Sequence, residues 1–198
     1  MKIGVRDFTY GKFASGGEGA ACVYTGGRMV KDRMVNVDYN VTRDSGRMDA
    51  DDHPIARDND ITDVELSLEL AQLDKEVAAD ILGWLRVGET NEYLEITSAS
   101  PYVGIGFAVY EKDADDGTKL FRGVWLEKMQ MGLESDSVRT KGQNIEYQTE
   151  TISGNGLAVQ TEAAEVTNGE YHFRRIMFDC ATLAACETWL KGKAGIQS

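Results

Sequence analysis

Residues 63–70 read Asp-Val-Glu-Leu-Ser-Leu-Glu-Leu, a strict alternation of polar and aliphatic side chains. Successive side chains of a β-strand point to opposite faces of a sheet, so Val64, Leu66, Leu68 and Leu70 would share one face. This period of two predicts a strand with one buried face and one face in water. It is the clearest strand in the sequence.

Further strands are expected, and they outnumber the expected helices. The turn signal Asp115-Asp116-Gly117 lies between two of them, which predicts an antiparallel hairpin of residues 102–110 with residues 120–129. The sequence therefore predicts a mainly β fold. The remaining strand candidates are residues 21–24, 34–41, 92–97, 143–151 and 171–178.

Two segments carry the period of an amphipathic helix, and both are expected to pack against the sheet. The first begins at Lys75 after Asp74, which can cap it, and its apolar stripe consists of Val77, Ile81, Trp84 and Leu85. The second is expected from about residue 179 to residue 191, with Gly192 as its stop signal. Its apolar face consists of Leu183, Cys186, Trp189 and Leu190.

The three cysteines are an odd number without a CxxC pair, so no disulfide framework is predicted. Cys180 and Cys186 both fall in the second expected helix, about 9 Å apart along its axis at ~1.5 Å rise per residue. A bridge between them would break that helix. We therefore interpret all three cysteines as small buried hydrophobic residues in a reducing compartment.

Length and charge limit the possible functions. A chain of 198 residues without a linker is expected to form one domain over residues 1–198. No apolar run approaches the roughly 18 residues of a membrane span, and the opening residues have no secretory pattern, so a soluble cytosolic chain is expected. The net charge of −12 disfavours specific nucleic-acid binding, which usually needs a basic face.

No catalytic or metal-binding pattern is found in the sequence. His53 and His172 have no partner at metal-ligand spacing. The glycines at 104 and 106 lie within a strand candidate, where glycine more often marks a bend, a bulge or the close approach of another backbone. Trp84, Trp125 and Trp189 are assigned to packing. The sequence predicts a protein that is not an enzyme and has no cofactor and no metal.

Residues 43–60 form a long polar connection between two strand candidates, residues 34–41 and 61–70. Connections of this length are usually functional or disordered. Burying its carboxylates without partners would cost several kcal/mol each, so the segment must meet water or a neighbouring subunit. Its interspersed charges predict an extended arm for contact between copies, with the candidate residues Arg43, Asp44, Arg47, Asp49, Asp51, Asp52, His53, Arg57 and Asp58.

Several short blocks occur in a recognisable order. They are residues 3–10, the alternating strand with the following residues 74–85, residues 107–110, residues 121–126 (Phe-Arg-Gly-Val-Trp-Leu) and residues 148–154 (Gln-Thr-Glu-Thr-Ile-Ser-Gly). The last two are the most specific. Together with Glu187-Thr188-Trp189 near the C-terminus, this order resembles the major tail proteins, or tail tube proteins, of siphophages.

The resemblance implies a β-sandwich or barrel-like fold with one helix packed on the sheets and a C-terminal helix. It implies self-assembly into stacked, hexameric rings that form a tail tube for DNA ejection, with the arm used in stacking. Expected partners are copies of the chain and other tail proteins, such as the tape measure and the tail terminator. DNA would pass through the lumen without specific binding. The expected location is the virion tail, assembled in the host bacterial cytoplasm.

Three alternatives remain open at this point. A tube protein of a type VI secretion system or of a contractile phage tail would share the fold and the stacking. A monomeric β-barrel that binds a small apolar ligand would also show strands with one apolar face. An enzyme of unrecognised type is the third alternative.

Overall fold

Strand β6 (Asp60–Leu70) contains the alternating segment, and one of its faces is buried as predicted. The exposed fractions of Val64, Leu66, Leu68 and Leu70 lie between 0% and 2%. The computed structural model that shows this describes residues 2–18, 20–44, 47–50, 53–57, 60–88, 92–95, 100–113, 117–135, 149–160 and 172–196.

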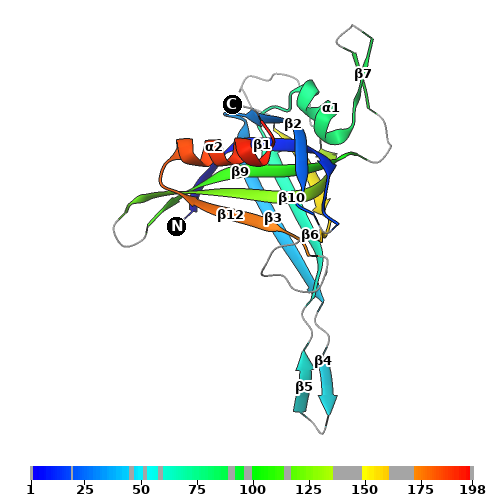
Figure 1. Ribbon diagram of the computed structural model, residues 1–198, viewed down its shortest axis with the longest axis vertical. Coiled ribbons are helices and arrows are strands. Elements are labelled where there is room, and N and C mark those ends of the chain that lie inside the picture. Colours follow the sequence, from blue (N-terminus) through cyan, green and yellow to red (C-terminus); the bar gives the residue numbers. More distant parts are fainter. Residues whose placement is uncertain are drawn as a thin grey trace, which may run out of the picture.

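Strands predominate, which confirms the mainly β prediction (Figure 1). Before β6 lie β1 (Lys2–Ser15), β2 (Val23–Val30), β3 (Met34–Asp44), β4 (Arg47–Ala50) and β5 (His53–Arg57). After it come α1 (Lys75–Leu82), β7 (Leu85–Val87), β8 (Glu92–Leu94), β9 (Tyr102–Lys112), β10 (Lys119–Ser135), β11 (Glu150–Gly156), β12 (Arg175–Cys180) and α2 (Leu183–Lys193).

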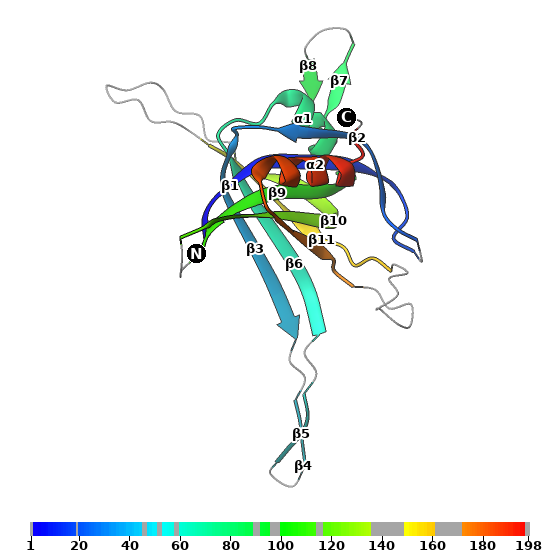
Figure 2. The same ribbon diagram turned by 60° about the vertical axis from the view of Figure 1, so that its left-hand side comes forward.

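The largest sheet is antiparallel and follows the order β2-β1-β9-β10-β11-β6-β3, with β12 paired to β10 beside this path. Strands β9 and β10 form the predicted hairpin, in which Phe121 lies opposite Tyr110 and Trp125 lies opposite Gly106. The second edge of β10 is divided, because residues 121–126 pair with β12 and residues 129–135 pair with β11. The sheet therefore splits at β10, and β6 and β3 cross behind β9 and β10 (Figures 1 and 2).

Two hydrophobic clusters result from this arrangement. The larger one lies between β1, β9 and β10 on one side and β3, β6 and β11 on the other, with α1 packed against it. The smaller one lies between α2 and the outer face of β9 and β10, and it is centred on Trp125, Tyr24 and Leu190. Because both faces of β9 are covered, residues 103–108 are all buried and show no alternation of burial.

Gly104 and Gly106 make room for the indole of Trp125. A Cβ at Gly106 would lie 2.5 Å from Trp125 Cε3 and 2.8 Å from Leu190 Cδ2, and one at Gly104 would lie 2.6 Å from Tyr24 Cε1 and closer still to Trp125 Cζ2. Distances below 3.0 Å are not found for real Cβ atoms. The glycine pair thus makes a slot for an aromatic side chain, whereas the sequence suggested a bend, a bulge or the close approach of another backbone.

Helix α1 begins after Asp74 as predicted, although the Asp74 side chain makes no capping hydrogen bond. The helix ends earlier than predicted because Gly83 adopts a left-handed conformation with φ of 78°. Trp84 and Leu85 therefore lie beyond the helix, and Leu85 is 54% exposed. The assignment of Leu85 to the buried stripe was wrong, whereas Trp84 lies outside the helix but still packs against the core, and Val77 and Ile81 are buried as predicted.

Helix α2 was predicted to begin near residue 179, but it begins at Leu183. The Thr182 side chain accepts a hydrogen bond from the Ala185 backbone N–H, which caps the helix at this later position. The helix continues through Gly192 to Lys193, so the predicted stop at Gly192 was also wrong.

The prediction that the cysteines are unbridged was wrong for two of them. Cys180 is the last residue of β12 rather than part of a helix, and it forms a disulfide with Cys186 of α2, with a Cα–Cα distance of 5.5 Å. The bridge joins a strand to a helix and breaks neither element. Cys22 is free and half-buried. A reducing compartment was inferred from unbridged cysteines, so the disulfide removes the support for that inference.

Strand β1 was not predicted, because a bulge interrupts it. Its register against β9 shifts between Arg6 and Thr9, and Asp7 in this shift has a φ of 60°, in the left-handed region. Asp7 is 4% exposed, and its Oδ2 atom has no hydrogen-bond partner among the described residues. Burial, and then the charge of Glu187, raise the pKa of the Asp7 carboxyl.

Replacing Asp7 with Asn should stabilise the fold, and more so at higher pH. A carboxyl whose pKa is raised by folding binds its proton more tightly in the folded state. Its contribution to the stability of the fold is therefore greatest below the unfolded pKa of about 4. That contribution is lost as the pH rises through the folded pKa. Because asparagine does not ionise, Asp7→Asn avoids this loss of stability at higher pH, and asparagine also tolerates a positive φ. The free energy of unfolding should rise by about 1 kcal/mol at neutral pH.

The measurement is denaturant unfolding of both proteins between pH 4.5 and 8. Asp32→Asn is the matched control, because Asp32 also has a positive φ, of 57°, but is exposed. The Asp32 charge also raises the pKa of the Asp7 carboxyl, as the weakest of the causes, so the control should stay much closer to the wild-type pH dependence than Asp7→Asn does. Equal pH profiles for the wild type and Asp7→Asn would contradict the prediction.

Candidate assembly surfaces

The predicted arm is a two-stranded ribbon that continues a hairpin of the main sheet. Strands β3 and β6 pair from Met34 and Leu70 to Asp44 and Asp60, which confirms that residues 43–60 connect a hairpin. Beyond this point β4 and β5 pair with each other, with Ala50 opposite His53. Figures 1 and 2 show β4 and β5 away from the rest of the sheets, in line with β3 and β6.

The structure places most of the arm's candidate residues on this ribbon. Arg43 lies near the end of β3 and has an exposed side chain. The backbone of five more is strand: Asp44 in β3, Arg47 and Asp49 in β4, and His53 and Arg57 in β5. The candidates that lie outside the described residues are Asp51, Asp52 and Asp58.

Three strands of the large sheet have only one paired edge among the strands that the structure describes, namely β2, β3 and β12. Each of these edge strands exposes an apolar side chain, and in β2 it is Val23, which is 50% exposed. Met177 and Phe178 of β12 are 52% and 43% exposed, and Val35 of β3 is 50% exposed. An unpaired edge with apolar side chains is a template for pairing with another chain.

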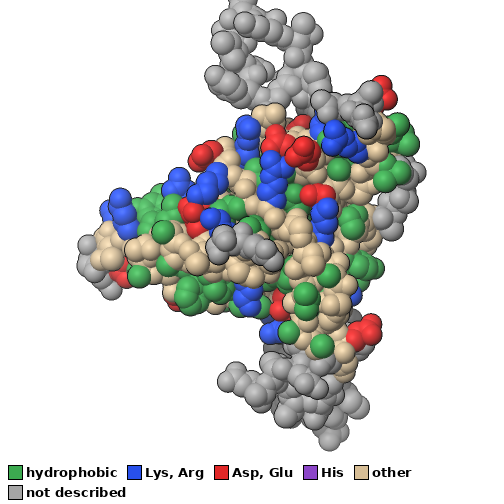
Figure 3. All heavy atoms as spheres, turned by 45° about the horizontal axis from the view of Figure 1, so that its top comes forward, with side chains coloured by type: hydrophobic (Ala, Val, Ile, Leu, Met, Phe, Trp, Pro, Cys, Tyr) green, Lys and Arg blue, Asp and Glu red, His purple; other side chains and the backbone are tan. Residues whose placement is uncertain are grey.

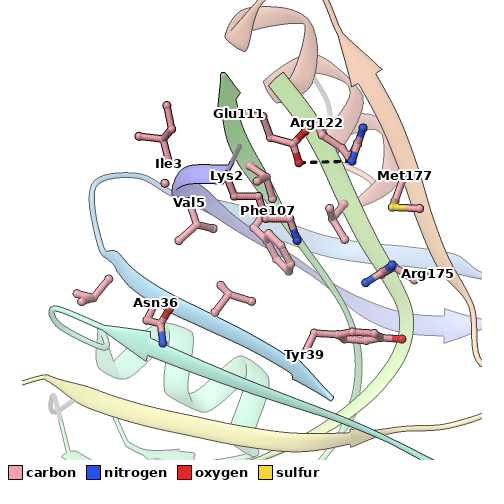
Figure 4. Close-up of a pocket in the computed structure, with 15 residues that line it drawn as sticks. Lys2, Ile3, Val5, Asn36, Tyr39, Phe107, Glu111, Arg122, Arg175 and Met177 are labelled. Atoms are coloured by element: carbon pink, nitrogen blue, oxygen red, sulfur yellow. Dashed lines mark hydrogen bonds and ion pairs between the residues drawn. The ribbon is translucent and has the colours of Figure 1, made fainter. Parts of the chain in front are cut away.

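An apolar groove of about 510 Å³ lies between β3 and β12, with the starting residues of β1 and parts of β9 and β10 as its other walls (Figure 4). Its deepest residues are Phe107 and Val124, which are 5% and 6% exposed. Ile3, Val35 and Met177 line it and are about half exposed. The groove is therefore open to the surface, and it lies where two edge strands face each other.

The charged residues of the groove are mainly basic. Arg122 is engaged, because its Nε lies 2.7 Å from Asp179 Oδ1 and its Nη1 lies 3.4 Å from Glu111 Oε1. The Arg175 guanidinium stacks over the ring of Tyr39 at 4.6 Å. Within the described parts of the chain, no ion pair joins Lys2 or Arg175 to an acid. The groove thus presents two cations in a chain of net charge −12.

The groove residues were not predicted from the sequence as a site. They come from five strands, and their proximity depends on the crossing of β3 behind β9 and β10. The only partial signal is the run Ile-Met-Phe at residues 176–178, whose apolar character exceeds what a half-buried edge strand needs.

A buried cluster of ionisable groups, Cys22, Glu127 and Arg174, lies near the start of β2. Glu127 is 7% exposed, its Oε2 lies 3.3 Å from Arg174 Nη1, and the Cys22 thiol approaches the same oxygen at 4.0 Å. Burial, and then the charge of Glu127, raise the pKa of the Cys22 thiol. Since a nucleophilic cysteine needs a lowered pKa, this environment keeps the thiol protonated and unreactive.

Three further residues, His172, Trp125 and Trp189, occupy structural positions. His172 forms a bridge with Val159 through both backbone hydrogen bonds, and Trp125 and Trp189 pack in the cluster under α2. In the described ranges, no group of three or more His, Cys, Asp or Glu side chains is arranged to hold a metal ion.

The face seen in Figure 3 carries Lys and Arg side chains interspersed with Asp and Glu rather than a continuous basic area. Such a mixture lacks the basic stripe that is typical of nucleic-acid-binding surfaces. Among the residues described, no helix is long and apolar enough to cross a membrane. A comparison with models of known protein families gave no match, and a search among curated proteins gave none either.

Proposed function

We propose that this chain is a structural protein that assembles with copies of itself into stacked rings, the tail tube of a long-tailed bacteriophage. The observation that carries the proposal is the arm of β3, β4, β5 and β6, which extends a hairpin of the core sheet away from the body. An isolated two-stranded ribbon is at best marginally stable in water. A neighbouring subunit that packs against it would explain why the chain maintains such an extension.

The unpaired edges of β2, β3 and β12 support the same proposal. A monomer normally protects its sheet edges, whereas a ring uses them for contacts between copies. A contact between two different surfaces of the chain forms a closed ring when its rotation closes, and rings that stack through an arm form a tube. The net charge of −12 would let DNA pass along the lumen without binding.

A purely structural role also agrees with the chemistry of the buried cluster. The raised pKa of the Cys22 thiol leaves no activated nucleophile there. A tube protein of a contractile tail or of a type VI secretion system would have the same requirements, and the helical parameters of an assembled tube would distinguish these from a siphophage tube.

The second candidate function is binding of a small apolar ligand. It is favoured by the groove of about 510 Å³, which is within the range of roughly 300 to 1,000 Å³ typical of ligand pockets. In this case the chain would remain monomeric, and an apolar ligand would bind in the groove with one molecule per chain.

Negative-stain electron microscopy and sedimentation velocity of the purified full chain distinguish the two functions. As the protein concentration is raised, we expect rings and then tubes of constant diameter. A chain that remains monomeric at all accessible concentrations, and that binds a fluorescent fatty acid at one equivalent, would contradict the tube proposal and support ligand binding.

A further inference from the structure

The hairpin of β7 and β8 has an exposed apolar face. Leu85 lies opposite Leu94, and Val87 lies opposite Glu92. Residues opposite each other in an antiparallel pair share a face, as do alternate residues of one strand, so Leu85, Val87, Leu94 and Glu92 all lie on the same face. The three aliphatic side chains are 54%, 45% and 54% exposed.

This hairpin is separate from the main sheet. Its two strands pair only with each other, and Figures 1 and 2 show them projecting beyond α1, at the end of the molecule away from β4 and β5. Single exposed aliphatic residues are common on protein surfaces, but three on one face of a projecting ribbon form a contiguous patch. Patches of this kind mark sites of interaction.

The groove between β3 and β12 is complementary to this face, because it is apolar, has room for the aliphatic side chains and carries the opposite charge. Its floor is apolar, and a volume of about 510 Å³ has room for three aliphatic side chains. Lys2 and Arg175 line it, whereas the hairpin face carries the acid Glu92 among its apolar residues. Docking would bury the apolar patch and would bring Glu92 near these cations.

The occupant must come from a second copy. Both ribbon views place β7 and β8 beyond α1, away from the N-terminus that borders the groove. The two surfaces are different parts of the chain, so their contact is heterologous. A contact of this type leaves one free hairpin and one free groove on every pair, and it therefore continues until a ring closes or a filament forms.

We propose that the apolar face of the β7–β8 hairpin of one copy docks into the groove between β3 and β12 of the next copy. Glu92 then pairs with Lys2 and Arg175 of the copy that provides the groove. This inference rests on the proposed self-assembly and identifies the surfaces that join neighbouring copies, separately from the arm.

The test compares the self-association of variants of the full chain by sedimentation velocity and electron microscopy. Leu85→Ser with Leu94→Ser, and separately Glu92→Lys, should each weaken association on the order of tenfold or more. Glu92→Lys combined with Arg175→Glu should restore much of it, because the charge pair is re-formed with reversed signs. Leu120→Ser is the matched control, since Leu120 is 43% exposed but lies on neither surface.

Thermal unfolding by circular dichroism shows whether each variant remains folded, and the charge-reversal rescue remains decisive if the double serine variant unfolds. If the wild type assembles and the hairpin variants assemble equally well, the docking inference is overturned while the proposed function stands. If Glu92→Lys weakens assembly and Arg175→Glu does not rescue it, the pairing with the groove is wrong. A wild type that never associates would overturn both.

Discussion

Replacing residues 44–59 with a short Gly/Ser linker is expected to abolish tube formation and to leave the thermal unfolding of the chain nearly unchanged. In the described core, the buried side chain of β6 nearest the arm is Val64, and β4 and β5 pair only with each other. The core residues that the structure describes all lie outside the replaced segment. A shorter connection also slightly reduces the entropy cost of closing the hairpin.

The free energy of unfolding should change by less than about 1 kcal/mol, as for other surface changes away from the core. The measurements are thermal unfolding and negative-stain electron microscopy at a concentration at which the wild type forms tubes. A second variant, Arg47→Glu with Arg57→Glu, keeps the length of the arm and changes only its charge. Normal tubes from the linker variant would exclude the arm from assembly, and a large loss of stability would show that it contributes to folding.

Gly104→Ala is expected to destabilise the monomer by about 3 kcal/mol, at the upper end of the usual cost of overpacking a core. The added Cβ would overlap the rings of Trp125 and Tyr24 at once. Trp125 is fully buried and its ring packs edge-on against Tyr24 at 5.1 Å between centroids, so neither ring has space to move away. The Gly104 backbone itself needs no unusual φ, so the effect would come from packing alone.

Equilibrium unfolding in urea measures this effect, and Gly4→Ala is the matched control. Gly4 also lies in a strand of the sheet, but a Cβ there would have no atom within 4 Å. Trp125→Leu should be less harmful in combination with Gly104→Ala than the sum of the two single effects, because the smaller side chain frees the slot. Additive effects in this double-mutant cycle would rule out the proposed overlap.

The sequence could predict the elements that have a regular alternation of buried and exposed residues or a clear turn signal. Strand β6 is buried on one face only, and the hairpin of β9 and β10 is signalled by its turn. Strand β1 escaped prediction because the bulge at Asp7 shifts the register and so changes which residues face the core. The end of α1 was misplaced because Gly83 stops the helix while apolar residues continue at the helical spacing.

The candidate surfaces depend on contacts that no local pattern encodes. Residues 43–60 could be recognised as a polar connection between two strands, but the pairing of β4 with β5 within it was not predicted. The groove is lined by residues that are far apart in the sequence, from Lys2 to Met177. The bridge of Cys180 and Cys186 was missed for a related reason, because a helical period was extended over a residue that belongs to a strand.

The division of the second edge of β10 has a mechanical consequence. Because β12 and β11 share that edge, one continuous strand is hydrogen-bonded into both layers of the fold. Sliding or tilting one layer against the other would break backbone hydrogen bonds of β10, and the disulfide adds a covalent link from β12 to α2. Each subunit should therefore respond to force as a stiff body. In a tube of such subunits, bending and twisting would be confined to the joints between copies, at the arm and at the docked hairpin.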